Sequence, residues 1–414
     1  MDWEQQAQQR IEQIRKGDFV VEIVDSTDRP VQGATVRADM LRHDFSFGTA
    51  IACKLLINDS PDRDTYRRHI LELFNRGTLE NYYKWRFQEQ DDTRQLADQA
   101  SEWLLDNGMS IHGHTLIWQS FKYGTTPKDI VDMLKSDDDG RAEYVRRRAL
   151  EHIDRTVRRY RGRIREWDVI NENFSEHELV KVLDPDSPIE EAPSLVAWMQ
   201  AARAADPLAA LYVNDFGILV GDDEVHKASY ERHIAHLIRS GAPIGGIGMQ
   251  GHYTNGSKRR SPQQLIETLD RFAKFGLPIQ ITEFDMFGKL WGDTPEQIDS
   301  AQAEFLRQFL VTVFSHPAVG GFTMWGFWDG RHWMGNSPLL RKDWSPKPGY
   351  HVYRDLVLKR WWTNAAGASD AAGRYGFRGF YGTYRVQVEH QGRRVEREVR
   401  FDRGAGSARL YLAQ

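Results

Sequence analysis

Two glutamates each end a stretch of apolar residues that has the length of a buried strand. Glu172 comes near the end of EWDVINEN (Glu166 to Asn173), and Glu283 comes near the end of PIQITEF (Pro278 to Phe284). If both strands deliver their ends to one site, the two carboxyl groups can face each other. One of them can then donate a proton while the other attacks as an anion, provided that their surroundings separate the two pKa values. Such a pair, with aromatic residues around it, is typical of glycoside hydrolysis.

Neighbouring side chains offer the means to separate the two pKa values. His252 and Asp285 could hold Glu283 as an oriented anion. Glu172 lies between two asparagines in an aromatic setting, where desolvation favours the neutral carboxylic acid. Once Glu283 has reacted its charge is gone, so Glu172 loses its proton more easily and can act as a base toward water.

The middle of the chain holds the elements that must position these residues. Short apolar strands alternate there with longer helical patterns such as DDTRQLADQASEWLLDNG. Eight successive units of this kind predict an α/β fold, the (β/α)8 TIM barrel, whose parallel strands are apolar on both faces. The eight expected strands are residues 45–51, 76–85, 110–118, 166–173, 210–216, 244–253, 278–284 and 321–328.

Polar residues gather where these strands end. In such a barrel the carboxyl ends of the strands face the ligand site, so these side chains are the candidate site residues. In chain order they are Glu80, Asn81, Lys84, His114, Trp118, Gln119, Asn171, Glu172, Asn214, Asp215, Gln250, His252, Glu283, Asp285, Trp325, Trp328 and Trp333.

The two ends of the chain follow a different pattern. Phe19, Val21 and Ile23 alternate with other residues, and residues 382–402 alternate strictly around a turn at Gly392. This pattern predicts half-buried antiparallel strands. Neither end has enough strands to be stable alone, so we expect a small accessory β-sandwich built from both, with two separate flaps as the alternative. The expected division is an N-terminal helix and β segment at 1–42, the barrel at 43–361 and a C-terminal β segment at 362–414.

Composition excludes several classes of protein. The net charge is -4 and no basic block is present, so we expect neither a nucleic-acid nor a membrane partner. No apolar run reaches the length of a membrane span. Cys53 is the only cysteine, which excludes an internal disulfide. The polar N-terminus lacks the pattern of a signal peptide, so the protein is either intracellular or secreted with its leader removed. We expect a monomer.

Two other classes of function stay open on the residues alone. His112 and His114 lie two apart on one strand, as a metal-binding pair does in metal-dependent barrel hydrolases. Against this, such enzymes usually carry the pair on the first strand, and later strand ends offer only His252 as a further imidazole. The other class is a sugar-binding barrel without catalysis, which would require one of the two glutamates to be replaced.

The chain resembles glycoside hydrolase family 10, the endo-1,4-β-xylanases, from about Phe45 to Tyr350. The matching motifs, in the order of that family, are FSFGTAI, TLENYYKW, GHTLIW, WDVINEN, LYVNDF, GIGMQGH, ITEFD, TMWGFWDGRHW and KPGY. The resemblance implies a retaining endo-1,4-β-xylanase that acts on xylan or xylo-oligosaccharides without a metal or organic cofactor. Another β-1,4-glycosidase, such as a glucanase, is the alternative.

The resemblance also implies roles for single residues. Glu172 is similar to the general acid/base, Glu283 to the nucleophile, and Asn171 to the residue that binds the 2-hydroxyl of the sugar at the cleaved bond. His252 and Asp285 are similar to the pair that supports the nucleophile. The residues similar to substrate contacts or cleft walls are Glu80, Asn81, Lys84, His114, Trp118, Gln250, Trp325 and Trp333.

The sequence departs from the family pattern at several positions. Gln119 stands where the family usually has a histidine, and we expect it to contact the site and modify the pKa of Glu172. His112 stands where arginine is common, and Phe216 where tyrosine is common. Asn173 also departs from the pattern, and we expect it to have a structural role.

Overall fold

The computed structural model describes residues 2–254, 257–336 and 338–412. The chain divides into two compact units. One consists of residues 1–46, 305–317 and 349–414, and the other of residues 47–304 and 318–348. Among the described residues, no helix combines the length and the apolar character needed to cross a membrane.

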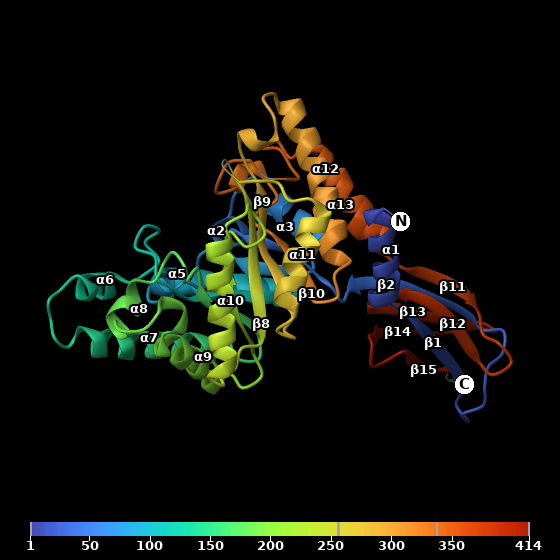
Figure 1. The fold of residues 1–414 in the computed structure, drawn as a ribbon. Helices are drawn as coiled ribbons and strands as arrows, with labels where there is room; N and C mark the ends of the chain where they lie inside the picture. The colour runs from blue at the N-terminus through green and yellow to red at the C-terminus, as the bar shows by residue number, and fades with distance from the viewer. Residues whose placement is uncertain (1, 255–256, 337, 413–414) are drawn as a thin grey trace. The chain divides into compact units, whose positions relative to one another are not determined.

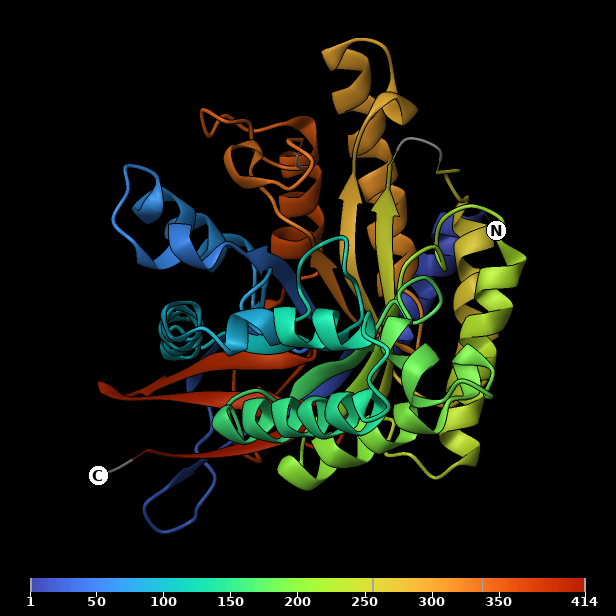
Figure 2. The same cartoon turned by 90° about the vertical axis from the view of Figure 1, so that its left-hand side faces the viewer.

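The second unit holds the predicted barrel. Eight strands close in the order β10-β3-β4-β5-β6-β7-β8-β9, which confirms the expected TIM barrel. Figure 1 shows β8 beside β9, and Figure 2 shows the same two strands from a second side. All residues of β9 are buried, as expected for a parallel strand covered by helices. The strands are β3 (Ser46–Ile51), β4 (Arg76–Leu79), β5 (Ser110–Trp118), β6 (Glu166–Asn171), β7 (Ala210–Asp215), β8 (Gly246–Tyr253), β9 (Ile279–Met286) and β10 (Val319–Met324).

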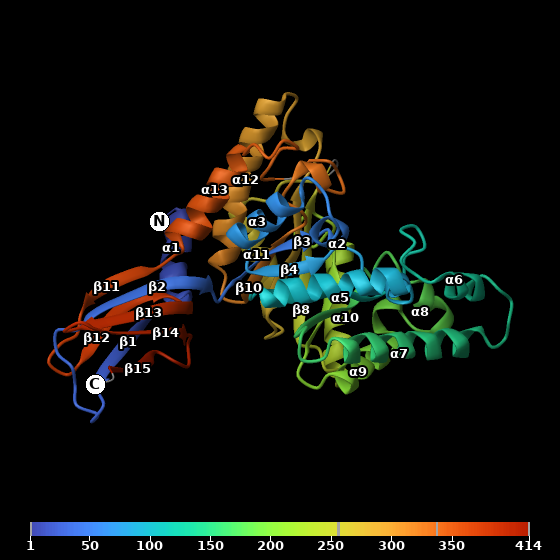
Figure 3. The ribbon, with the colours of Figure 1, turned by 180° about the vertical axis from the view of Figure 1, so that it is seen from behind.

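Amphipathic helices follow the strands. In α7 the residues Val145, Ala149 and Ile153 are spaced by four and buried, whereas Arg147 and Glu151 on the opposite face form an exposed ion pair at 2.7 Å. Both α5 and α7 pack against β5, and Figure 3 shows them from behind. The helices are α2 (Cys53–Ile57), α3 (Arg63–Leu73), α4 (Trp85–Gln88), α5 (Asp91–Asp106), α6 (Lys128–Leu134), α7 (Arg141–Arg159), α8 (Glu178–Leu183), α9 (Pro193–Ala205), α10 (Glu224–Arg239), α11 (Pro262–Ala273), α12 (Pro295–Phe314) and α13 (Pro348–Asp355).

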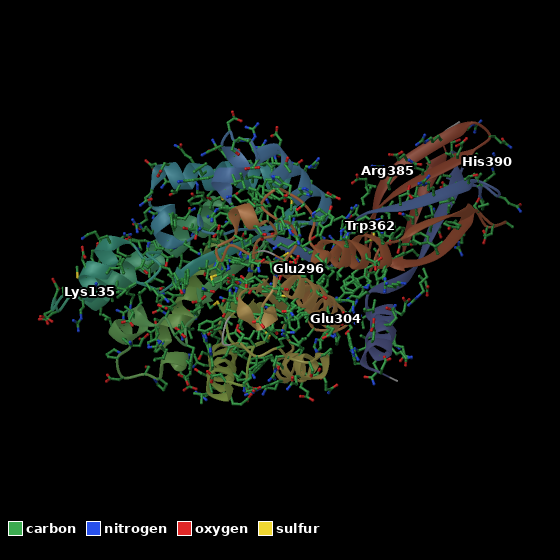
Figure 4. All side chains as sticks on the ribbon, turned by 90° about the horizontal axis from the view of Figure 1, so that it is seen from above. Lys135, Glu296, Glu304, Trp362, Arg385 and His390 are labelled. Atoms are coloured by element: carbon green, nitrogen blue, oxygen red, sulfur yellow. The ribbon has the colours of Figure 1, made fainter. Side chains whose placement is uncertain are left out.

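The first unit contains two β-sheets built from both ends of the chain, as expected. Their orders are β12-β1-β15 and β11-β2-β13-β14. The pairing is antiparallel except that β1 pairs with β15 in parallel, which corrects the expectation of a wholly antiparallel sandwich. Figure 4 labels Arg385 and His390 on β13. The elements are α1 (Trp3–Ile14), β1 (Lys16–Asp25), β2 (Thr35–His43), β11 (Asn364–Ala368), β12 (Arg374–Phe380), β13 (Gly382–His390), β14 (Arg393–Phe401) and β15 (Ser407–Leu412).

Aromatic packing holds this unit together. Phe19 of β1 stacks on Phe401 of β14 with ring centroids 4.5 Å apart, so the two ends of the chain share one core and are not separate flaps. Phe314, at the end of α12, stacks on Trp361 at 4.1 Å and contacts Phe45 at 5.0 Å. Because of this packing, residues 305–317 and 349–361 belong to this unit, whereas the sequence predicted a barrel over 43–361.

Candidate active site

A cavity of about 820 Å³ opens within the barrel unit. Its lining combines the two glutamates with polar and aromatic residues from most of the predicted strand ends. The predicted residues that line it are Glu80, Asn81, Lys84, His114, Trp118, Glu172, Gln250, His252, Glu283, Trp325 and Trp333. The sequence pattern therefore located one common site.

Glu172 directly follows β6 and carries a raised pKa. Trp118 Nε1 donates a hydrogen bond to its Oε2 at 3.0 Å, and Gln250 Nε2 donates to its Oε1 at 2.9 Å. Burial, and after it the negative charge of Glu283, raise the pKa of Glu172 to about 7. The carboxyl group can therefore hold a proton close to neutral pH.

The pKa of Glu283 on β9 is shifted in the opposite direction. Asn214 Nδ2 donates to its Oε1 at 3.0 Å, and His252 Nε2 lies 3.2 Å from its Oε2. Burial alone would raise the pKa of Glu283, but the charge of His114 and the hydrogen bond from His252 outweigh burial and lower this pKa. Two glutamates in one cavity are thus driven toward different protonation states, as acid catalysis by one and nucleophilic attack by the other require.

His252, which is half-buried, and the buried Asp285 form a pair next to Glu283. His252 Nδ1 lies 3.0 Å from Asp285 Oδ1. Burial alone would lower the pKa of His252, but the carboxylates of Asp285 and Glu283 raise it well above its usual value. Trp333 Nε1 donates to the other oxygen of Asp285 at 2.6 Å, so Asp285 fixes both the imidazole and a wall of the cavity.

Asn214, at the end of β7, links the ends of the two strands that deliver Glu172 and Glu283; the sequence placed it among the strand-end candidates but predicted no role for it. Its Nδ2 donates to Asn171 Oδ1 at 2.9 Å as well as to Glu283. Thr282 Oγ1 donates to Asn214 Oδ1 at 2.7 Å and fixes the orientation of the amide. The Nδ2 atom of Asn171 is buried without a hydrogen-bond partner among the described residues, and Asn171 is not among the residues that line the cavity. The sequence did indicate Asn214 as a candidate site residue, because it lies at the end of a predicted strand.

His112 and His114 share one buried carboxylate. His112 Nε2 and His114 Nδ1 each lie 2.9 Å from an oxygen of Asp168. His112 Nδ1 also lies 3.2 Å from Glu166, which pairs with Arg76 at 2.8 Å. These three imidazole nitrogens are engaged by carboxylates, which does not fit the metal-binding pair considered from the sequence. In the part of the chain that the structure describes, no cluster of histidine, cysteine or acidic residues is arranged to hold a metal ion.

Aromatic and charged side chains form other parts of the wall. Lys84 is buried, donates to Asn81 Oδ1 at 3.1 Å and places its Nζ 4.7 Å from the centre of the Trp118 ring. Burial lowers the pKa of Lys84. Tyr123, which the sequence did not single out, stacks on Trp118 with centroids 5.0 Å apart and lines the cavity. Glu80 accepts a hydrogen bond from Arg331 Nη2 at 3.0 Å.

The prediction that Gln119 contacts the site is wrong, because its side chain lies elsewhere. Its Oε1 accepts the backbone N–H groups of Leu179 and Val180 at 2.8 and 3.0 Å, and its Nε2 donates to Asn173 Oδ1 at 3.1 Å. The amide therefore caps the first turn of α8, because the side chain next to Trp118 points to the opposite side of the strand end. Asn173 also donates to the carbonyl of Ile189 at 3.1 Å, which fits the structural role expected for it.

Trp328, the remaining aromatic strand-end residue, stacks on Trp344 with centroids 4.0 Å apart. It is buried and is not among the residues that line the cavity.

Comparison with known proteins places this site in a family. Residues 37–356 match the family model described as Glycosyl hydrolase family 10. Anti-sigma-I factor RsgI6 of Acetivibrio thermocellus is 29% identical over 98% of this chain and 49% of its own length. Endo-1,4-beta-xylanase 1 of Arabidopsis thaliana is 28% identical over 91% of this chain and 37% of its own length. The chain thus spans half or less of these two relatives.

Shorter relatives and solved structures agree with the match. Endo-1,4-beta-xylanase B of Thermotoga neapolitana is 29% identical, with 72% of this chain and 85% of that protein covered. The crystal structure of native xylanase 10B from Thermotoga maritima superposes with a TM-score of 0.66 at 26% identity, covering 77% of this chain and 96% of that one. Because the family model matches more than half of the chain, the protein belongs to glycosyl hydrolase family 10.

Proposed function

We propose that this chain is a retaining endo-1,4-β-xylanase that hydrolyses internal bonds of xylan and xylo-oligosaccharides by double displacement. The observation that carries the proposal is that Glu172 and Glu283 line one cavity and are held there by different side chains. Trp118 and Gln250 hold Glu172, whereas Asn214 and His252 hold Glu283, and these surroundings shift the two pKa values in opposite directions. Several relatives that this chain resembles are named endo-1,4-beta-xylanases, which supports xylan as the substrate.

In the first step, the ionised Glu283 attacks the anomeric carbon while Glu172 gives its proton to the leaving oxygen. Asn214 and His252 hold the attacking carboxylate from both of its oxygens. Trp118 and Gln250 hold the two oxygens of Glu172. The bond to the leaving oxygen breaks as the ester bond to Glu283 forms.

In the second step, Glu172 acts as a base instead of an acid. The charge of Glu283 is one cause of the raised pKa of Glu172, and formation of the ester removes that charge. The pKa of Glu172 then falls, so the carboxylate left by the first step can accept a proton from water. The water attacks the anomeric carbon and releases Glu283, and the two displacements together retain the anomeric configuration.

Polar contacts to the sugar assist both steps. Asn214 links Asn171 Oδ1 to Glu283. The Nδ2 atom of Asn171, which has no hydrogen-bond partner among the described residues, can donate to the 2-hydroxyl. Hydrogen bonds to this hydroxyl strengthen in the oxocarbenium-like transition state. Trp325 and Trp333 supply apolar wall area against which a sugar ring can pack.

The products formed from xylan and from mixed-linkage glucan test the substrate. The proposal expects a series of xylo-oligosaccharides to appear early from xylan, with much slower release of sugar from the glucan. Preferential hydrolysis of the glucan would instead indicate a β-glucanase in the same family fold.

A further inference from the structure

The segment that carries Glu172 adopts an unusual backbone conformation. Glu172 has φ 56°, in the left-handed region that non-glycine residues rarely occupy. Such a conformation is strained in a non-glycine residue and persists only where neighbouring contacts enforce it. One such contact is the backbone N–H of Glu172, which donates to the carbonyl of Asn214 at 2.8 Å. A second lies two residues further along, at Phe174.

Phe174 packs flat on His226 of α10. The two ring centroids are 4.0 Å apart with an interplanar angle of 17°. His226 is 3% exposed and lines the cavity, and the ring of Phe216 meets it at 81° with centroids 5.1 Å apart. Gly217 lies close to the ring as well, since a Cβ at this position would be 3.0 Å from His226 Nδ1. The imidazole is therefore enclosed by residues that follow β6 and β7.

The remaining nitrogen of His226 faces a buried carboxylate. His226 Nε2 lies 3.1 Å from Asp215 Oδ1, and Asp215 is 1% exposed. The same carboxylate accepts the backbone N–H of Phe216 at 2.9 Å and that of Phe174. Asp215 thus joins the end of β7, the segment after Glu172 and the first turn of α10.

Asp215 also acts on Glu172 through its charge. Its negative charge is one of the influences that raise the pKa of Glu172, after burial and the charge of Glu283. The other charged groups facing Glu172 are His252 and Lys84. Asp215 itself faces His226 and the phenol of Tyr230 on α10, and Asp223 accepts the backbone N–H of His226.

We propose that His226 is a positioning residue for the general acid, acting through the Phe174 ring and the Asp215 carboxylate. The ring contact holds the strained segment that presents Glu172 to the leaving oxygen. The contact with Asp215 keeps a negative charge beside Glu172 and so favours its protonated form. The inference rests on the proposed function, because it concerns the acid step of that reaction.

Two substrates separate an effect on the acid from a general loss of structure. A xylo-oligosaccharide has a poor leaving group and needs protonation, whereas 2,4-dinitrophenyl β-xylobioside has a leaving group that departs without it. The ratio kcat/KM reports the first displacement for both. His226→Ala is expected to lower kcat/KM on xylotetraose by about 10-fold or more, since general acid catalysis contributes roughly 10²–10⁴-fold. The loss on the dinitrophenyl substrate is expected to stay below about threefold.

Three further variants complete the experiment. His226→Phe keeps a flat ring against Phe174 but lacks the nitrogen that faces Asp215, so it is expected to recover only part of the loss on xylotetraose. Val225→Ala changes the adjacent residue, whose side chain is 71% exposed, and is expected to leave both substrates unaffected. Asp215→Asn removes the charge but keeps an acceptor for Phe216, so the alkaline limb of kcat/KM is expected to move to lower pH.

The possible outcomes are distinct. Equal losses on both substrates in His226→Ala, or an unmoved alkaline limb in Asp215→Asn, would overturn the inference while the proposed function stands. If the wild-type protein hydrolysed neither substrate, the proposed function itself would fail.

Discussion

Asn214 donates to Glu283 Oε1 at 3.0 Å from an amide that is fixed on its other side by Thr282. The same Nδ2 atom reaches Asn171 at 2.9 Å. One buried amide therefore aligns Glu283 on β9, the proposed nucleophile, with Asn171 on β6, the proposed contact to the sugar. Removing this amide should disturb the attacking group and the transition-state contact together.

Asn214→Ala is expected to lower kcat/KM on xylan by about 10- to 100-fold, because a hydrogen bond to a charged group contributes roughly 1.5–3 kcal/mol. Asn214→Asp keeps the side-chain size but adds a carboxyl group beside Glu283. Like charges raise the pKa of Glu283, so the acid limb of the pH profile should move upward in this second variant. Activity of Asn214→Ala within twofold of the wild type would contradict the assigned role.

The pH dependence of the wild-type protein follows from the two glutamates. Glu172 acts as an acid only while protonated, and its pKa is about 7, so kcat/KM should fall as pH rises through about 7. Glu283 acts only while ionised, and its pKa is lowered, so activity should persist below the usual titration range of a glutamate. Kinetics across this range on an unactivated xylo-oligosaccharide measure both limbs. If the fall of kcat/KM at high pH is the same in Glu172→Gln as in the wild type, the group that causes it is not Glu172.

Gln250→Leu tests the polar contact on Glu172. The hydrogen bond from Gln250 lowers the pKa of Glu172, so its loss should raise that pKa further. A bond of about 1 kcal/mol corresponds to roughly 0.7 pKa unit, and the alkaline limb should move upward by about this amount. The acid limb belongs to Glu283 and should keep its position, which provides an internal control. A downward movement of the alkaline limb would be inconsistent with the contact.

Treatment with a chelator tests the metal alternative. His112 and His114 each direct a nitrogen at Asp168, and a further His112 nitrogen lies at Glu166, so we expect no dependence on a divalent ion. Hydrolysis of xylan should proceed at the same rate before and after dialysis against EDTA. Loss of activity that is restored by one added metal would revive the metal-dependent mechanism.

The sequence predicted the barrel and most of the cavity because both depend on local patterns. Runs buried on both faces indicated the strands, and the barrel places their carboxyl ends at one site. Glu172 and Glu283 could therefore be found without coordinates. The terminal strands were also predicted from alternation, but alternation does not determine pairing direction. The parallel contact of β1 with β15 is for this reason visible only in the structure.

The remaining parts of the site depend on side-chain direction and on long-range packing. The pairing of β5 with β6 is irregular between His114 and Ile117, so counting along β5 does not tell which side chains face the cavity. For this reason the sequence wrongly predicted that Gln119 faces the cavity, whereas its neighbour Trp118 does contact Glu172. Tyr123 lies on a loop and His226 on a helix, and neither position follows a strand-end pattern.

The central claim is that Glu283 forms a covalent bond to the sugar, and mechanism-based labelling tests it most directly. A 2-deoxy-2-fluoro xylobioside with a dinitrophenolate leaving group slows both displacements, but its reactive leaving group lets the first proceed, so the glycosyl-enzyme accumulates. Proteolysis and mass spectrometry of the inactivated protein should find one added fluoroxylobiosyl group on the peptide that contains Glu283. A label on Glu172, or hydrolysis of xylobiosides with inversion and no covalent adduct, would contradict the account.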